Sequence, residues 1–139
     1  MLDSKLLISE LIGAGILKNE KDVHFKPLTG GVSSDIWLLE QGDQRWVVKQ
    51  ALDRLKVEDV WMADVRRNVA EQDFITYLSD FQPEAVPKMV WQNRNVPYFV
   101  MEYLGLPWEP WKAKLLKGDF DRGIATSAAR LLADLHSHS

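Results

Sequence analysis

The spacing of apolar residues changes in the middle of the chain, and the change leaves one economical arrangement. Residues 23–50 hold three short extended runs, of which the last two are joined by Gly42-Asp43. A two-residue turn of this kind between apolar runs is typical of a β-hairpin. Residues 57–81 contain no glycine or proline and place apolar side chains at helical spacing, until Pro83 ends the pattern. We therefore expect three antiparallel strands followed by a long helix.

A further helix precedes these strands, and a second hairpin follows the long helix. Residues 4–17 carry an apolar stripe at helical spacing, and Asp3 or Ser4 can cap its start. Residues 89–91 and 96–103 form two more extended runs, separated by asparagine-rich turn residues. The fold class that follows is α+β, with a five-stranded antiparallel sheet and one helix inserted after the third strand.

The composition changes after the last of these runs, where a proline-rich connector begins. A closing helix follows it, with Asp119 or Asp121 as the expected cap. We expect residues 1–104 to form one domain and residues 105–139 to form a linker that ends in this helix.

Bulk composition excludes several classes of protein. The 139 residues include no cysteine, which excludes a disulfide scaffold, a thiolate metal site and a cysteine nucleophile. The formal net charge is −3 and no basic run stands out, so nucleic-acid binding is not expected. No apolar stretch is long enough to span a bilayer, and the N-terminus lacks the pattern of a signal peptide. We expect a cytoplasmic protein without a membrane partner.

Two adjacent glycines, Gly30 and Gly31, lie between the first two predicted strands, and Ser33 and Ser34 follow them. Glycine lets the backbone adopt positive φ and come close to another group. The exposed N–H groups of such a turn can surround phosphate oxygens, and the serine hydroxyls can add donors. The alternative is an ordinary hairpin turn, because the string has neither the Walker nor the dinucleotide spacing.

Lys49 is the second candidate. In an extended strand it shares one face with Val47, while the neighbouring apolar residues Trp46 and Val48 occupy the other face. Both faces carry large apolar residues, so we expect a central strand that is covered on both sides. A lysine there needs an anionic partner, because burying an isolated ammonium group is costly. The alternative is that the side chain reaches a solvated edge of the sheet.

Glu71 is the expected partner of Lys49. At 100° per residue, this glutamate falls on the apolar side of the long helix. The neighbours on that side are Phe74, Ile75 and Leu78. A carboxylate in such surroundings would be satisfied by a lysine on the adjacent strand. Glu58 and Asp64 are rival partners, and a purely structural ion pair is the alternative interpretation.

Residues 98–105 form an apolar strand that runs into a glycine and then the connector. Such a strand end exposes backbone donors and acceptors that can pair with the edge of a purine. The alternative is simply the last strand of the sheet.

The order of these parts resembles the N-terminal lobe of protein kinases, and residues 46–49 are similar to the Val-Ala-Ile-Lys element. The individual strings are more similar to the aminoglycoside phosphotransferase and choline kinase branch. Residues 28–36 resemble its phosphate loop, residues 99–105 its hinge, and residues 131–137 its Leu-Ala-x-Leu-His helix. The resemblance covers residues 20–139.

The resemblance implies a site for ATP. The backbone of Gly30 and Gly31, with Ser33 and Ser34, would hold the phosphates. Lys49 would contact the α- and β-phosphates and would itself be held by Glu71, as a phosphate-positioning ion pair rather than as catalytic residues.

The resemblance also implies the contacts of the adenine ring. Ile36 and Val47 would cover the ring, and Met101 would occupy the gatekeeper position. The carbonyl of Glu102 and the amide of Leu104 would bind the edge of the ring.

The family also needs parts that are missing here. Its catalytic base and its Mg²⁺ ligands come from a His-x-Asp-x-x-x-x-Asn loop and a later aspartate, both in a C-terminal lobe. The chain contains no His-x-Asp, so we expect a truncated kinase lobe that alone transfers no phosphate. In the full-length protein, the acceptor would be an aminoglycoside-like molecule or an amino alcohol.

Two further expectations concern an alternative function of this lobe and the contacts of its closing helix. The alternative function is a non-catalytic interaction or regulatory module that keeps the fold without useful ATP affinity. Leu131, Leu132 and Leu135 form an apolar stripe on the closing helix, which we expect to fold back on the lobe or to mediate self-association.

Overall fold

The computed structural model describes residues 3–28, 33–52 and 62–138. The chain divides into two compact units, Met1–Tyr103 and Leu104–Ser139. The first unit contains the sheet with two long helices and a short 3-10 turn, and the second contains two helices.

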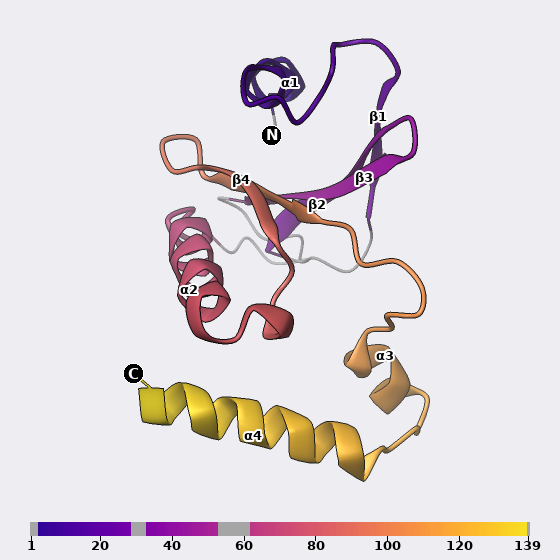
Figure 1. Ribbon diagram of the computed structural model, residues 1–139, viewed down its shortest axis with the longest axis vertical. Helices are drawn as coiled ribbons and strands as arrows, with labels where there is room; N and C mark the ends of the chain where they lie inside the picture. The colour runs from indigo at the N-terminus through magenta and orange to yellow at the C-terminus, as the bar shows by residue number, and fades with distance from the viewer. Residues whose placement is uncertain (1–2, 29–32, 53–61, 139) are drawn as a thin grey trace. The chain divides into compact units, whose positions relative to one another are not determined.

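A five-stranded antiparallel sheet forms the first unit's centre, with the order β1-β2-β3-β5-β4 (Figure 1). The strands are β1 (Val23–Pro27), β2 (Ser34–Gln41), β3 (Gln44–Ala51), β4 (Met89–Asn93) and β5 (Tyr98–Glu102). Gly42 joins β2 to β3 with a φ of 59°, a conformation that glycine adopts without strain. The predicted α+β class and five-stranded antiparallel sheet are confirmed, and β3 is central as expected.

The second hairpin differs slightly from its prediction. The Asn93 side-chain oxygen accepts hydrogen bonds from the amides of Asn95 and Val96, both at 2.9 Å. An asparagine that bonds the backbone in this way favours a turn. The turn therefore includes Pro97, and β5 begins at Tyr98 rather than at residue 96.

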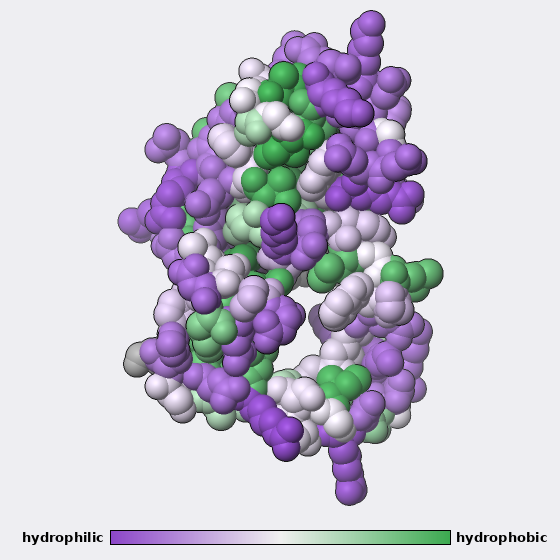
Figure 2. Space-filling model, in the orientation of Figure 1, coloured by the Kyte–Doolittle hydropathy of each residue, from purple (hydrophilic) through white to green (hydrophobic). Residues whose placement is uncertain are grey.

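Helix α1 (Ser4–Gly13) covers one face of the sheet, and the Asp3 carboxylate caps it by accepting from the amides of Lys5 and Leu6. On the face drawn in Figure 2, apolar atoms gather over α1 and are bordered by polar ones. The core on this side is built from one set of alternate strand residues and the helix. Its buried members are Leu7, Leu11, Leu17, Leu39, Trp46, Val48, Tyr98 and Val100.

Helix α2 (Arg67–Phe81) packs against the opposite face of the sheet (Figure 1). The prediction of a helix from residue 57 is wrong at its start. Residues 53–61 lie outside the described part, and residues 62–66 are not helical. The Asp64 carboxylate accepts from the Arg66 amide at 2.8 Å, and such a side-chain bond to the backbone favours a turn over a helix.

The buried side of α2 also differs from the prediction. Ile75 and Leu78 are buried as expected, but Phe74 is 48% exposed. Two amide side chains, Asn68 and Gln72, are buried instead. They can be buried because both hydrogen-bond to the sheet, and these bonds turn the helix so that Phe74 points away from the core.

The second unit contains α3 (Trp111–Leu116), which lies within the expected linker, and α4 (Arg122–His138). The Asp121 carboxylate caps α4 by accepting from the Gly123 amide at 2.7 Å, which selects it over Asp119. No described residue of α4 is buried, and the expected self-association through its leucines stays a prediction. Within the described ranges, every helix is too short or too polar to cross a membrane.

Candidate functional site

The side chains of Lys49 and Glu71 form an ion pair on the α2 side of the sheet, with 2.5 Å between Lys49 Nζ and Glu71 Oε1. Lys49 lies between Ile36 and Phe99 in the sheet register, and Phe99 is fully buried. Lys49 therefore has apolar cross-strand neighbours on both sides in the sheet, and its ammonium meets the Glu71 carboxylate. The predicted pairing is present, and the pair is partly exposed.

The rival partner Asp64 is engaged elsewhere. Its Oδ2 lies 2.6 Å from Nη2 of Arg66. The hydrogen bonds from Arg66 lower the pKa of Asp64, which keeps this carboxyl group ionised beside its own arginine. The other rival, Glu58, lies outside the described residues.

Two buried amides hold α2 in the position that brings Glu71 over Lys49. Asn68 Nδ2 donates to the Lys49 carbonyl at 3.2 Å. Gln72 Nε2 donates to the side chain of Asn68 at 2.9 Å and to the Tyr98 carbonyl at 3.2 Å. These bonds tie the helix to β3 at Lys49 itself and to the neighbouring strand β5, and they were missed in the sequence. Their signal was available, because Asn68 and Gln72 are four residues apart on the helix side that carries Ile75.

The apolar residues predicted to cover an adenine ring lie on the same sheet face as Lys49. Ile36 pairs with Lys49, and Val47 pairs with Met101. Leu38 pairs with Val47 from the other side and is buried, although the sequence analysis did not name it. Strand alternation alone would have found it, since Leu38 is two residues from Ile36.

The serines after the glycine pair lie at the start of β2, whereas Gly30 and Gly31 are outside the described residues. Ser34 pairs with Ala51 and is 6% exposed, so its side chain is enclosed. The Ser33 carbonyl accepts from the Leu52 amide at 3.0 Å. The end of the predicted phosphate turn is thus attached to the end of β3, two to three residues beyond Lys49.

The predicted hinge begins at the end of β5. Glu102 turns its side chain toward β4, where Oε1 accepts from the Lys88 amide at 2.7 Å. The Glu102 amide in turn donates to the Lys88 carbonyl at 3.0 Å. Leu104 is the first residue of the second unit. The adenine contacts of Glu102 and Leu104 stay predictions.

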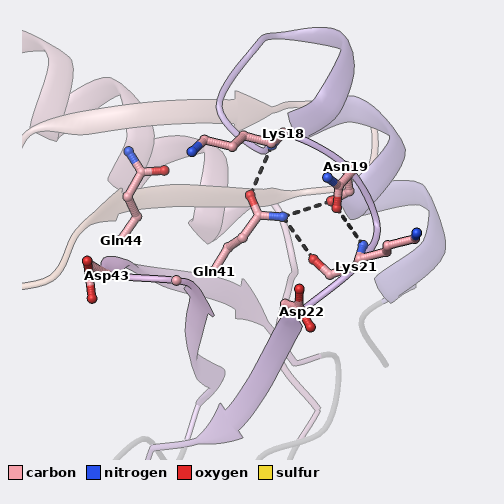
Figure 3. A pocket seen from close by; sticks show the side chains of 8 residues that line it. Lys18, Asn19, Lys21, Asp22, Gln41, Asp43 and Gln44 are labelled. Carbon is pink, nitrogen blue, oxygen red and sulfur yellow. Dashed lines mark hydrogen bonds between the residues drawn. The ribbon is translucent and has the colours of Figure 1, made fainter.

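A hollow of about 580 Å³ lies at the other end of the β2–β3 hairpin (Figure 3). Its lining includes Gln41, whose side-chain amide is already hydrogen-bonded at both its oxygen and its nitrogen. Oε1 accepts from the Lys18 amide, and Nε2 donates to the carbonyls of Asn19 and Lys21. Opposite charges are mixed around it, so the hollow offers no concentrated charge to an ionic ligand. Among the described residues, no cluster of histidine and acidic side chains is arranged to hold a metal ion.

Comparison with known proteins identifies the family of the chain. No curated protein matches the chain in sequence. The family model described as the phosphotransferase enzyme family (APH) matches residues 24–139, which include α2, the second unit and the sheet except for its first residue. The resemblance that the glycine turn, the strand lysine and the closing helix indicated is thereby confirmed, and the chain belongs to the phosphotransferase enzyme family.

Proposed function

We propose that the first unit binds the triphosphate of ATP as the nucleotide-binding lobe of a phosphotransferase. Together with a C-terminal lobe, it would serve the transfer of the γ-phosphate to a hydroxyl group of an aminoglycoside-like or amino-alcohol acceptor. The observation that carries this proposal is the ion pair between Lys49 and Glu71. Membership of a phosphotransferase family supplies the class of reaction.

The ammonium of Lys49 is suited to meet an anion. It has three donors, of which Glu71 Oε1 takes one, and the lysine side chain keeps 23% of its surface exposed. Glu71 holds the lysine in one conformation before the nucleotide arrives. Because the side chain is already ordered, less conformational entropy is lost when phosphates bind.

The surroundings of the pair fit a nucleotide base beside the phosphates. Ile36, Val47 and Met101 present apolar surface on the same face as Lys49. Apolar walls with a few fixed polar groups are typical of small-molecule sites. We propose that these three side chains contact the adenine ring.

Phosphoryl transfer needs further groups. Bound Mg²⁺ ions neutralise charge on the phosphates, and a carboxylate orients the acceptor hydroxyl. The described residues hold no cluster suited to a metal ion, and the 139 residues contain no His-x-Asp. We therefore propose that this chain by itself binds ATP without turning it over, and that the metal ligands and the base come from a C-terminal lobe.

Calorimetric titration with a non-hydrolysable ATP analogue tests the nucleotide site. We expect weak binding to the chain, and a loss of affinity of about tenfold or more in Lys49→Ala, because one charge-assisted contact is removed. Lys21→Ala is the control, since Lys21 is an exposed lysine at the opposite end of the hairpin.

The outcomes separate the proposal from the non-catalytic alternative. If the folded wild-type chain binds no analogue at millimolar concentration, the module has lost the nucleotide and the proposal is wrong. Equal losses in Lys49→Ala and Lys21→Ala would show binding by general charge rather than at this site.

A further inference from the structure

Arg67, the first residue of α2, joins three separate segments through its guanidinium group. Nη1 donates to the Asp64 carbonyl at 2.8 Å. Nη2 donates to the Leu52 carbonyl at 2.5 Å and also to the Ser33 carbonyl. One side chain therefore binds the approach to the helix, the end of β3 and the start of β2.

The contact with Ser33 concerns the predicted phosphate turn. On the near side of the turn, the Leu28 amide donates to the Ile36 carbonyl at 2.9 Å. On the far side, the Ser33 carbonyl accepts from both the Leu52 amide and Arg67. Leu28 and Ser33, which flank the centre of the turn, are thus attached to the sheet, and Arg67 adds an attachment from the helix to Ser33.

Arg67 and Glu71 are four residues apart on α2, so they lie on neighbouring positions of the same helix side. Glu71 holds Lys49, and Arg67 holds Ser33. A single helix therefore sets the position of the lysine and of the turn together.

The chemistry of the contact requires arginine. A guanidinium group is planar and has five N–H donors, so it can serve three carbonyl oxygens in fixed directions. Lysine carries a compact charge on a flexible stem and cannot reproduce this fork. A cation at the start of a helix is also unfavourable toward the helix dipole, so helix stability does not explain its presence.

We infer that Arg67 is a positioning residue for Ser33 and Ser34, the described end of the predicted phosphate turn, which it keeps attached to the end of β3 so that these residues and the Lys49 ammonium meet the same triphosphate. The inference rests on the proposed ATP site. It assigns to Arg67 no contact with the nucleotide, only the placement of the backbone that makes one.

The test compares affinity for ATP with affinity for adenosine in Arg67→Gln, Arg66→Gln and the wild-type chain. Misplacing a binding turn by a fraction of an ångström weakens its contacts strongly, so we expect Arg67→Gln to bind ATP about tenfold more weakly. Adenosine lacks phosphates, and its affinity should stay within about twofold. Arg66→Gln removes the same charge from the adjacent, exposed position, where the side chain pairs with Asp64, and should change neither affinity.

Arg67→Lys adds a second measurement and carries the test if Arg67→Gln does not fold. It keeps the charge but loses the planar fork, so we expect the ratio of ATP to adenosine affinity to fall here too. Full ATP affinity in Arg67→Lys would show that charge alone suffices and would overturn the inference.

Failure of the inference differs from failure of the proposed function. If Lys49→Ala loses ATP binding but folded Arg67→Gln keeps the wild-type ratio, the ATP site stands and the positioning role is wrong. If the wild-type chain shows no preference for ATP over adenosine, both ideas fall together.

Discussion

The two faces of the sheet are built from alternate residues of the same strands, yet they differ in character. The face under α1 is an apolar core closed by leucines and aromatic rings. The face under α2 carries an ion pair, two buried amides and an arginine bound to backbone carbonyls. Apolar burial supplies stability without direction, whereas hydrogen bonds place groups at defined positions. We infer that the α1 face stabilises the unit and that the α2 face holds the site.

The α1 face also carries a polar cluster, which attaches the helix to the β4–β5 hairpin. The Glu10 carboxylate accepts from Asn93 Nδ2 at 2.8 Å, from Trp91 Nε1 at 3.1 Å and from the Tyr98 hydroxyl. α1 precedes residue 24, where the family match begins. A helix outside the matched region is thus joined to the sheet by three hydrogen bonds and a shared core.

The largest expected effect is on the α1 face. Leu11 is fully buried, so Leu11→Ala should lower the free energy of unfolding by about 2–5 kcal/mol through lost burial and a cavity. Urea unfolding followed by tryptophan fluorescence measures the change. Leu6→Ala, at a position on the same helix that is 36% exposed, should cost much less. Equal effects of the two would mean that α1 is not packed on the sheet.

The second effect concerns the polar cluster on that face. Glu10→Ala leaves the donors of Trp91, Asn93 and Tyr98 without their acceptor, which should cost about 1–3 kcal/mol. The same urea measurement reports it, with Ser9→Ala on the neighbouring exposed position as the control. If Glu10→Ala left the free energy of unfolding unchanged, water would be replacing the carboxylate as the acceptor of these hydrogen bonds.

The third effect is a dependence of stability on pH. Burial, followed by the hydrogen bond to Glu10, raises the pKa of Tyr98 above its usual value. The contribution of Tyr98 to the free energy of unfolding is therefore fully present below a pH of about 10, where an unfolded tyrosine is neutral. This contribution decreases as the pH rises further. We expect Tyr98→Phe to lose less stability than wild type between pH 9 and pH of about 11. If the free energy of unfolding fell equally with pH in Tyr98→Phe and in wild type, this prediction would be contradicted.

The smallest effect on stability should lie on the α2 face, although the change removes the centre of the site. Lys49→Met breaks a partly exposed ion pair, so the free energy of unfolding should change by less than about 1 kcal/mol. Nucleotide binding should be lost in the same variant. Arg94→Gln, which breaks the exposed pair with Asp73 on the same helix, serves as the control for both measurements. A large loss of stability in Lys49→Met would remove the contrast between the two faces.

The division of residues between these faces could be predicted from the sequence. Alternation along β3 is a local property of extended backbone, so Val47 and Lys49 had to share one face and Trp46 and Val48 the other. The hairpin turn at Gly42 and the caps at Asp3 and Asp121 are likewise local, because each depends on residues within a few positions along the chain.

The place where α2 begins, and which of its sides is buried, was decided by contacts between distant residues. Arg67 bonds to Ser33 and Leu52, which are 34 and 15 residues away in sequence, and Gln72 bonds to Tyr98, 26 residues away. These bonds hold the helix where it begins at Arg67. Residues 62–66, which the apolar pattern places in the helix, are not helical, and Phe74 lies outside the core. The sequence by itself therefore determined the strands, their faces and Glu71 as the candidate partner of Lys49. Only the tertiary structure decided which backbone carbonyls the buried amides and Arg67 bind, because a pattern of neighbours carries no information about hydrogen bonds to remote backbone.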